Sequence, residues 1–303
     1  MAEKKRKLWI IGILLAAALL LALLFGTGVL SQAARNGNES SGPAETESPA
    51  WPDATRAPSG EIPVMRNEGD LYFPDQENWV YHFRYAYPHL LGDSYTVALI
   101  NDTYQMALDE KKNLELPMFA NAEEMRYDGH NEVWRDFTVM CNSDKLLSIL
   151  EMRRQTQGED AESLYLEALT FDTSGDYAGN SLTLRGVTLA LAGIDSENVE
   201  DTPEALAARY RGIIDGSSTL MGEKLMPVLY EQFQALQQSG VLLASWTAED
   251  FEQEVLPTQD FYVNGEGQIL FFFQPSLMTE PSLDPPVFAF TPDELEALLT
   301  GAS

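Results

Sequence analysis

The sequence of 303 residues is poor in the residues that most often hold metals or form disulfides. It has one cysteine, Cys141, and three histidines, His82, His89 and His130. A lone cysteine cannot form an internal disulfide, and its place in a strand-like segment predicts a buried, small apolar side chain. The histidines are too widely spaced for a helical metal-binding motif. We therefore expect no metal and no other cofactor.

Motifs of the common enzyme classes are also missing. There is no Gly-x-Ser-x-Gly elbow, no phosphate-binding glycine loop and no Cys-x-x-Cys pair. Gly265 and Gly267 lack the third glycine and the strand-to-helix context of a dinucleotide site, so they indicate a turn. We expect a protein that is not an enzyme. The alternative is a cell-envelope hydrolase or wall-modifying enzyme with a carboxylate-based site, because 47 acidic residues offer many pairs for such chemistry.

Basic residues are scarce. The chain has 19 Lys and Arg against 47 Asp and Glu, a net charge of −28. Four of the basic residues and one acidic residue lie before Leu8, so the chain from Leu8 onward carries a charge of −31. Such a surface repels nucleic acids and anionic lipids and attracts cationic partners. The alternative is that the acidity only confers solubility.

The basic residues at the start precede a long apolar run. Lys4, Lys5, Arg6 and Lys7 are followed by an uncharged, mostly apolar segment from 8 to 30. At 1.5 Å per residue this segment is long enough to cross a hydrocarbon core of about 30 Å. Its flanking charges predict a single-pass anchor with the N-terminus in the cytoplasm. A cleaved signal peptide is the alternative, because small residues follow at 31–33, but the run is longer than a usual signal peptide.

A linker separates this segment from the folded part. Residues 31–63 are rich in Gly, Pro, Ser, Ala and Glu and have almost no aliphatic side chains, so they cannot bury enough surface to offset chain entropy. The predicted organisation is a cytoplasmic basic stub (1–7), a transmembrane anchor or uncleaved signal (8–30), a disordered linker (31–63) and an extracytoplasmic domain (64–303) with two packed halves (64–190 and 191–303).

The first half of this domain predicts strands, hairpins and one helix. Five aromatic residues at period two indicate a strand with one buried face, and the alternative is a glycan-stacking platform; they are Trp79, Tyr81, Phe83, Tyr85 and Tyr87. Asp93 or Ser94 caps a helix that buries residues 97, 100, 104 and 108. Two antiparallel pairs are expected, 134–140 with 145–152 and 163–171 with 181–187.

The second half predicts three helices followed by a small sheet. The helices are expected at 202–216, 222–238 and 247–255. Strands are expected at 261–263, 268–273 and 287–290, and the first two are joined by a tight turn at 264–267. Thr291-Pro292-Asp293-Glu294 is a capping box that starts a final helix. The mixture predicts the α+β class, with antiparallel hairpins and sheets packed with several helices.

The order of aromatic strand, proline-rich loop, short strand and closing helix resembles the extracytoplasmic domain of RsiV-type anti-sigma factors. A related module precedes the catalytic domain in some peptidoglycan deacetylases. Tyr87-Pro88-His89-Leu90, Ile100-Asn101 and the segment 137–149 are similar to the family as well, so the resemblance covers about residues 75–300. The segments 158–161 and 276–286 depart from the family's pattern. Because only residues 1–7 precede the apolar run, no anti-sigma domain is expected in this chain.

The resemblance implies a membrane-tethered, extracytoplasmic module that binds or senses a ligand. The family's best-known member senses lysozyme, so the implied partner is a cationic wall-directed protein such as lysozyme, or a cell-wall component such as peptidoglycan. The proline-stiffened loop 274–286 is the first candidate for contact. Its predicted ligand-binding residues are Leu277, Met278, Glu280, Leu283 and Asp284. The alternative is that the apolar residues of this loop belong to the core.

Overall fold

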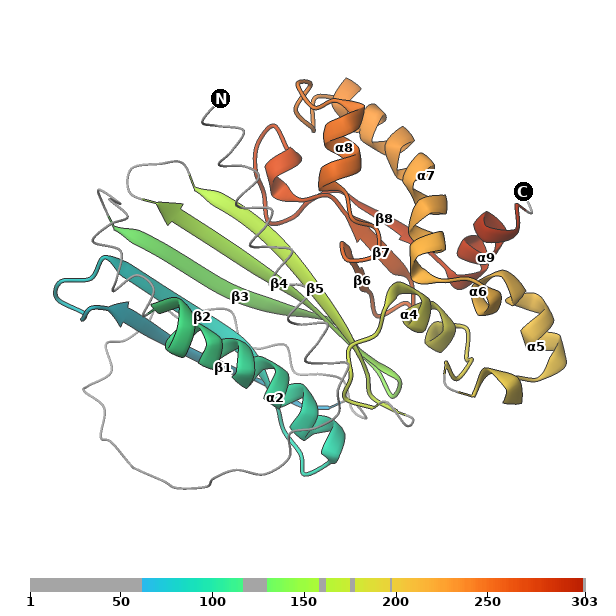
Figure 1. The fold of residues 1–303 in the computed structure, drawn as a ribbon, viewed down its shortest axis with the longest axis horizontal. Coiled ribbons are helices and arrows are strands. Elements are labelled where there is room, and N and C mark those ends of the chain that lie inside the picture. The colour runs from blue at the N-terminus through green and yellow to red at the C-terminus, as the bar shows by residue number, and fades with distance from the viewer. Residues whose placement is uncertain (1–61, 117–129, 158–161, 175–177, 197, 302–303) are drawn as a thin grey trace. The chain divides into compact units, whose positions relative to one another are not determined.

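Two β-sheets, of five and three strands, organise the folded part of the chain (Figure 1). The structure is a computed structural model and describes residues 62–116, 130–157, 162–174, 178–196 and 198–301. The larger sheet has the order β1-β2-β3-β4-β5. Its strands are β1 (Val64–Phe73), β2 (Tyr81–Leu90), β3 (Asn131–Asn142), β4 (Leu146–Gln157) and β5 (Ser163–Asp172). Strands β2 and β3 are parallel, and the other pairs are antiparallel.

The helix α2 (Tyr95–Glu110) connects the two parallel strands and packs on one face of this sheet (Figure 1). Ser94 is its N-cap, because the Ser94 hydroxyl accepts a hydrogen bond of 3.2 Å from the Val97 amide. The helix buries the four predicted positions, Val97, Ile100, Tyr104 and Leu108. The predicted helix is therefore confirmed. It continues into one π-helical turn, η1 (Lys111–Glu115).

The aromatic strand belongs to the core. Tyr81, Phe83 and Tyr87 are 3%, 0% and 1% exposed and pack under α2. The interpretation as core is confirmed for these three rings. The neighbouring strand β1 was not predicted, because its sequence is mostly polar and shows no clear alternation. It is held by ten backbone partners along β2, from Val64 opposite Leu90 to Phe73 opposite Tyr81.

One of the two predicted antiparallel pairs is confirmed. In the other pair, the first strand is confirmed and the second is wrong. Strands β3 and β4 pair as expected around the turn after Asn142. The segment 181–187, predicted as a strand, instead begins the helix α4 (Leu184–Leu191), and only Ser181 bridges to β5. Short apolar runs fit either structure, and here the hydroxyl of Thr183 caps the helix by accepting from the Gly186 amide.

The helices of the second half lie in the predicted segments, but their boundaries differ from the predictions. The predicted helix 202–216 is divided at Tyr210, whose φ of −114° and ψ of 33° are not helical. The next helix starts earlier than predicted, because Ser217 rather than a later residue provides the cap. The helical elements are η3 (Val199–Asp201), α5 (Glu204–Arg209), α6 (Arg211–Asp215), α7 (Ser218–Gln238) and α8 (Ala248–Glu254).

The C-terminal sheet is built as predicted. Strands β6 (Phe261–Val263), β7 (Ile269–Phe272) and β8 (Val287–Phe290) pair antiparallel in that order. Gly267 takes a φ of 75° in the turn between the first two, a conformation that favours glycine. The short helix η4 (Pro275–Leu277) follows β7. The capping box at Thr291 starts α9 (Pro292–Thr300), which buries Leu295.

The two sheets share an apolar layer. Leu150 of β4 and Leu166 of β5 are buried against Tyr262 and Phe272 of the small sheet. A second core lies among β6–β8, α4, α7, α8 and α9, and it includes the predicted buried cysteine, Cys141. No helix among the described residues is long and apolar enough to span a membrane. The predicted stub, anchor and most of the linker, up to residue 61, lie outside the described residues.

Candidate functional site

A cleft of about 650 Å³ lies beside β5, the last strand of the large sheet. Pockets for small ligands usually have volumes of about 300 to 1,000 Å³. One side is formed by residues 165–170 of β5 and the other by residues 181–183 and the turn before β6. The charged side chains that line it come from three strands and that turn: Arg135, Glu151, Arg153, Glu167 and Asp260.

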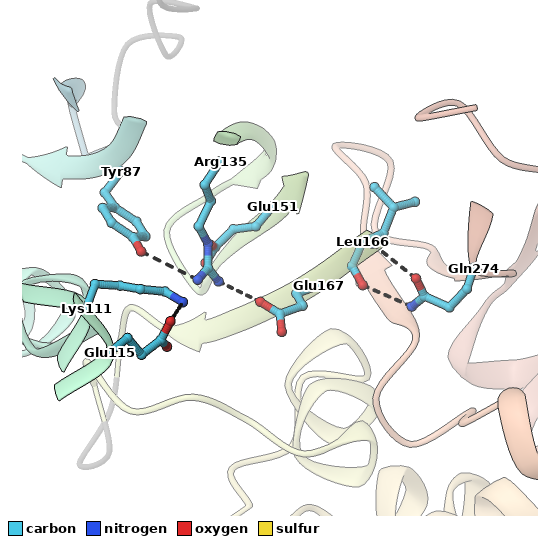
Figure 2. A network of polar contacts seen from close by, with 8 residues as sticks. All are labelled: Tyr87, Lys111, Glu115, Arg135, Glu151, Leu166, Glu167 and Gln274. Atoms are coloured by element: carbon cyan, nitrogen blue, oxygen red, sulfur yellow. Dashed lines mark hydrogen bonds and ion pairs between the residues drawn. The ribbon is translucent and has the colours of Figure 1, made fainter. Parts of the chain in front are cut away.

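Arg135 joins three of the strands (Figure 2). Its Nε lies 2.5 Å from Glu151 Oε2, and its Nη2 lies 2.6 Å from Glu167 Oε2. The guanidinium also lies over the ring of Tyr87, 5.3 Å from the centroid. The two carboxylates differ in environment, because the Glu151 side chain is 3% exposed and the Glu167 side chain is 60% exposed. One cation therefore balances a buried and a solvated carboxylate.

Burial has the largest effect on the pKa of Glu151. Removal of its carboxylate from water raises the pKa of Glu151, although the ion pair with Arg135 acts in the opposite direction. The register explains the contact, since Glu151 of β4 lies opposite both Phe137 of β3 and Glu167 of β5. All three acidic and basic groups thus point from the same face of the sheet.

The side chain of Gln274 closes part of the β5 edge (Figure 2). Its Oε1 accepts from the Leu166 amide at 3.0 Å, and its Nε2 donates to the Leu166 carbonyl at 2.9 Å. The same nitrogen donates to Asp260 Oδ1 at 2.9 Å. The primary amide therefore takes the place of a neighbouring strand at one residue of the edge.

Asp260 is the second buried carboxyl of the cleft. Burial raises its pKa to about 6, against the lowering effect of hydrogen bonds from the Leu256 amide and from Gln274. A pKa near neutrality lets a carboxyl both donate and accept a proton under physiological conditions. Asp260 therefore has this capacity, and Glu151 is another carboxyl of the cleft whose pKa is raised by burial.

A further ion pair lies where α2 ends (Figure 2). Lys111 Nζ contacts Glu115 Oε2 within η1 and lies 5.6 Å from the centroid of the Phe83 ring. Burial lowers the pKa of Lys111, and Arg153 and Arg135 lower it further through charge repulsion. The structure therefore buries this lysine at the end of the helix, near the cleft cations.

The predicted site loop is divided between core and surface. Leu277 is 0% exposed and Met278 is 8% exposed, and both belong to the second core. The short helix η4 turns these bulky side chains inward, as the core alternative expected, so they are not accessible anchors. Glu280 and Asp284 are exposed, and Leu283 packs on the apolar layer between the sheets.

Among the polar residues of the cleft, Gln274 is the first residue of the predicted contact loop 274–286, but Arg135, Glu151 and Asp260 were not predicted. Arg135, Glu151, Asp260 and Gln274 come from segments far apart in the chain, and no short motif joins them. One signal was present, because Arg135 interrupts the apolar positions of the β3 face. Within the described residues, no group of three or more His, Cys, Asp or Glu side chains is placed to hold a metal ion.

Comparison with known proteins finds similarity to solved structures but no match to a family model or a curated protein. Among solved structures, the chain is similar to a member of the DUF3298 family from Bacteroides fragilis NCTC 9343. The identity is 16%, the match covers 76% of this chain and 90% of that chain, and the TM-score is 0.38. This similarity does not assign a function to the cleft.

Proposed function

We propose that the protein is a membrane-tethered, extracytoplasmic ligand-binding or sensing module whose ligand occupies the cleft beside β5. The observation that carries this proposal is the cleft, which groups charged side chains of both signs with two buried carboxyls at a sheet edge. The basic and apolar residues at 4–30 support the membrane tether. The sequence resemblance of residues 75–300 to the outer domain of RsiV-type proteins supports the sensing role.

The proposed partner is a cationic protein such as lysozyme, or a cell-wall component such as peptidoglycan. A net charge of −28 supports a cationic partner, because a strongly acidic surface steers it inward. Glu280 and Asp284 give the loop before β8 an exposed acidic surface beside Leu283. The contact surface proposed on this loop excludes Leu277 and Met278, because both are covered by the core.

Binding by the full-length chain in detergent micelles tests the proposal. Calorimetry with lysozyme and with soluble peptidoglycan fragments should detect a complex, and the lysozyme affinity should fall as salt rises from about 50 to about 300 mM. Glu167→Gln tests the cleft, and the double variant Glu280→Gln with Asp284→Asn tests the loop.

The matched control is Glu223→Gln with Glu231→Gln, which removes two exposed charges from α7. A specific site predicts that the control pair leaves the affinity unchanged while a cleft or loop variant weakens it. Equal effects of all variants would reduce the attraction to net charge. If neither lysozyme nor peptidoglycan binds, the proposed partners are wrong.

A carboxylate-based hydrolase or wall-modifying enzyme is the second candidate. It is favoured by one observation, that Glu151 and Asp260 both have raised pKa values and line the same cleft. Both carboxyls also have structural partners, Arg135 and the Leu256 amide, and binding is therefore the first proposal. If the protein is such an enzyme, incubation with peptidoglycan or chitin oligosaccharides should release reducing ends or acetate. Glu151→Gln or Asp260→Asn should then abolish the release. Absence of any product would contradict it.

A further inference from the structure

Among the described residues, the Ala168 backbone of β5 has no hydrogen-bond partner at the edge of the sheet inside the cleft. The Leu166 amide and carbonyl point away from β4, because both bond to Gln274. The Thr170 carbonyl also points away from β4, because it accepts from the Leu182 amide at 2.7 Å. Alternation along a strand then directs the amide and carbonyl of Ala168 the same way.

In the described part of the chain, no hydrogen bond to the amide or carbonyl of Ala168 is formed on that side. Gln274 occupies the edge before it, and the segment around Leu182 occupies the edge after it. Ala168 itself lines the cleft and is partly exposed. A donor and an acceptor held in this geometry match the amide group of an added peptide chain.

Arg153 provides the second observation. It lines the cleft from β4, its Nη2 donates to Gln155 Oε1 at 2.9 Å, and its guanidinium lies 5.8 Å from the ring centroid of Tyr165. Its Nε is buried without a hydrogen-bond partner. No acidic side chain of the described residues forms an ion pair with it, unlike Arg135, which contacts two.

An arginine that forms no ion pair with a described acidic side chain is informative in this chain. Acidic residues outnumber basic ones by 47 to 19, so an unpaired guanidinium is not explained by a shortage of partners. The register places Arg153 directly opposite Arg135 on β3 and Tyr165 on β5. Two guanidinium groups side by side repel each other, and Glu151 and Glu167 compensate only the first. An incoming carboxylate would compensate the second.

The two features are separated by a distance that suits a short peptide. Tyr165, opposite Arg153, precedes Ala168 by three residues, or about 10 Å along an extended strand. Because Gln274 blocks the edge at Leu166, a bound chain must leave the plane of the sheet between the two positions. It then passes over the face that carries Glu167 and Arg153. Leu182, Leu256 and Phe261 are among the apolar residues that line the cleft.

From these observations we infer that the cleft binds a short peptide with a free carboxylate. The Arg153 guanidinium binds the carboxylate, and the Ala168 amide and carbonyl bind a main-chain amide of the peptide. This inference rests on the proposed ligand-binding function and names the chemical class of its ligand. A free protein C-terminus and a small wall-derived peptide share this chemistry.

Tetra-alanine carrying fluorescein on its amino end is the probe, in a free-acid and a C-terminal amide form. The full-length chain should bind the acid about 10-fold or more tightly than the amide, measured by fluorescence anisotropy, because a hydrogen bond to a charged group is lost. Arg153→Gln should lower the affinity for the free-acid probe to that for the amide probe. It should leave the affinity for the amide probe unchanged. Arg153→Lys should give an intermediate affinity for the free-acid probe, because lysine keeps the positive charge but lacks the paired N–H donors of the guanidinium.

The neighbouring arginine supplies the control. Arg154 follows Arg153 on β4, points to the other face, and pairs with Glu162 at 2.9 Å. Arg154→Gln should leave both affinities unchanged. Ala168→Pro removes the outward amide, a change that edge strands tolerate, and should weaken both probes alike. A probe with an ester in place of one amide tests the same contact without altering the protein.

The possible results separate this inference from the proposed function. If the wild-type chain binds acid and amide equally, or if Arg153→Gln has the same effect as Arg154→Gln, the carboxylate site is wrong. If lysozyme or peptidoglycan fragments bind and tetra-alanine does not, the peptide inference falls and the binding function stands. If an unlabelled free protein C-terminus displaces the probe and wall-derived peptides do not, the ligand is the C-terminus of a protein. If no ligand binds, both proposals fall.

Discussion

At the scale of single residues, the cleft has two glutamates that bind the same arginine but differ in burial. Glu151 is nearly inaccessible and depends on Arg135 for its counter-charge, while Glu167 on the next strand remains solvated. A buried ion pair gains little over an apolar pair, but the removal of one partner leaves a costly unpaired charge. The two glutamates that share one arginine should therefore respond differently to its loss.

Arg135→Gln should lower the free energy of unfolding by about 3 to 5 kcal/mol near neutral pH, measured by urea denaturation. Glu167→Gln should cost about 1 kcal/mol or less, because its carboxylate is exposed.

The pH dependence of the Arg135→Gln variant has a definite sign. Without Arg135, burial and the negative charge of Glu167 both act on the carboxyl and raise the pKa of Glu151 further above its unfolded value. A group with a raised folded pKa contributes stability below its unfolded pKa and loses that contribution as pH rises through the folded pKa. The deficit of the variant should therefore shrink as the pH is lowered. An equal deficit for Arg135→Gln and Glu167→Gln would contradict the assignment.

At the scale of elements, β5 is an edge strand that is covered by the side chain of Gln274 at Leu166 and by the segment around Leu182 at its end. Gln274, from the segment after β7, covers Leu166 and also contacts Asp260 at the start of β6. The contact links the edge of the large sheet to the small sheet. The protonation of Asp260 therefore acts directly on the element that limits the cleft.

Asp260→Asn should change how stability depends on pH. Burial raises the pKa of Asp260 from 3.8 to about 6, so its contribution is complete below about pH 4 and is lost as pH rises through about 6. Between about pH 4 and 7 the wild type should lose up to about 3 kcal/mol relative to the variant, measured by denaturant unfolding across pH. Asp284→Asn, at an exposed position, is the control and should follow the wild type. Parallel curves for wild type and Asp260→Asn would contradict the prediction.

At the scale of the whole molecule, the proposed location of the protein rests on its acidic charge and on its N-terminal residues. A charge of −31 from Leu8 onward would be repelled by anionic lipid headgroups, so a linker between membrane and domain is physically consistent with a tethered module. The predicted topology places residues 64–303 outside the cytoplasmic membrane and residues 1–7 inside.

Protease treatment of intact spheroplasts tests this topology. The C-terminal domain should be released or degraded while an epitope fused to the N-terminus stays protected, detected by immunoblot. Detergent lysis provides the control, because both ends then become accessible. Full protection of the domain before lysis would show that the predicted orientation is wrong.

The sequence by itself determined the elements whose cause is local. Ser94, Thr247 and Thr291 cap helices that start where the capping pattern predicts, because a cap acts within one turn. The aromatic strand and the C-terminal hairpin follow from periodicity and from glycine in a turn. The α+β class was predictable for the same reason, since it depends only on which elements are present.

Only the tertiary structure decided how these elements meet. The parallel pairing of β2 with β3, the strand β1, and the helix at 184–191 in place of a strand depend on distant partners. The same holds for the cleft, in which Gln274 bonds to a residue 108 positions earlier and Arg135 contacts a carboxylate 32 positions later. Patterns of neighbouring residues carry no information on such contacts, because register and packing choose among many chemically equivalent side chains.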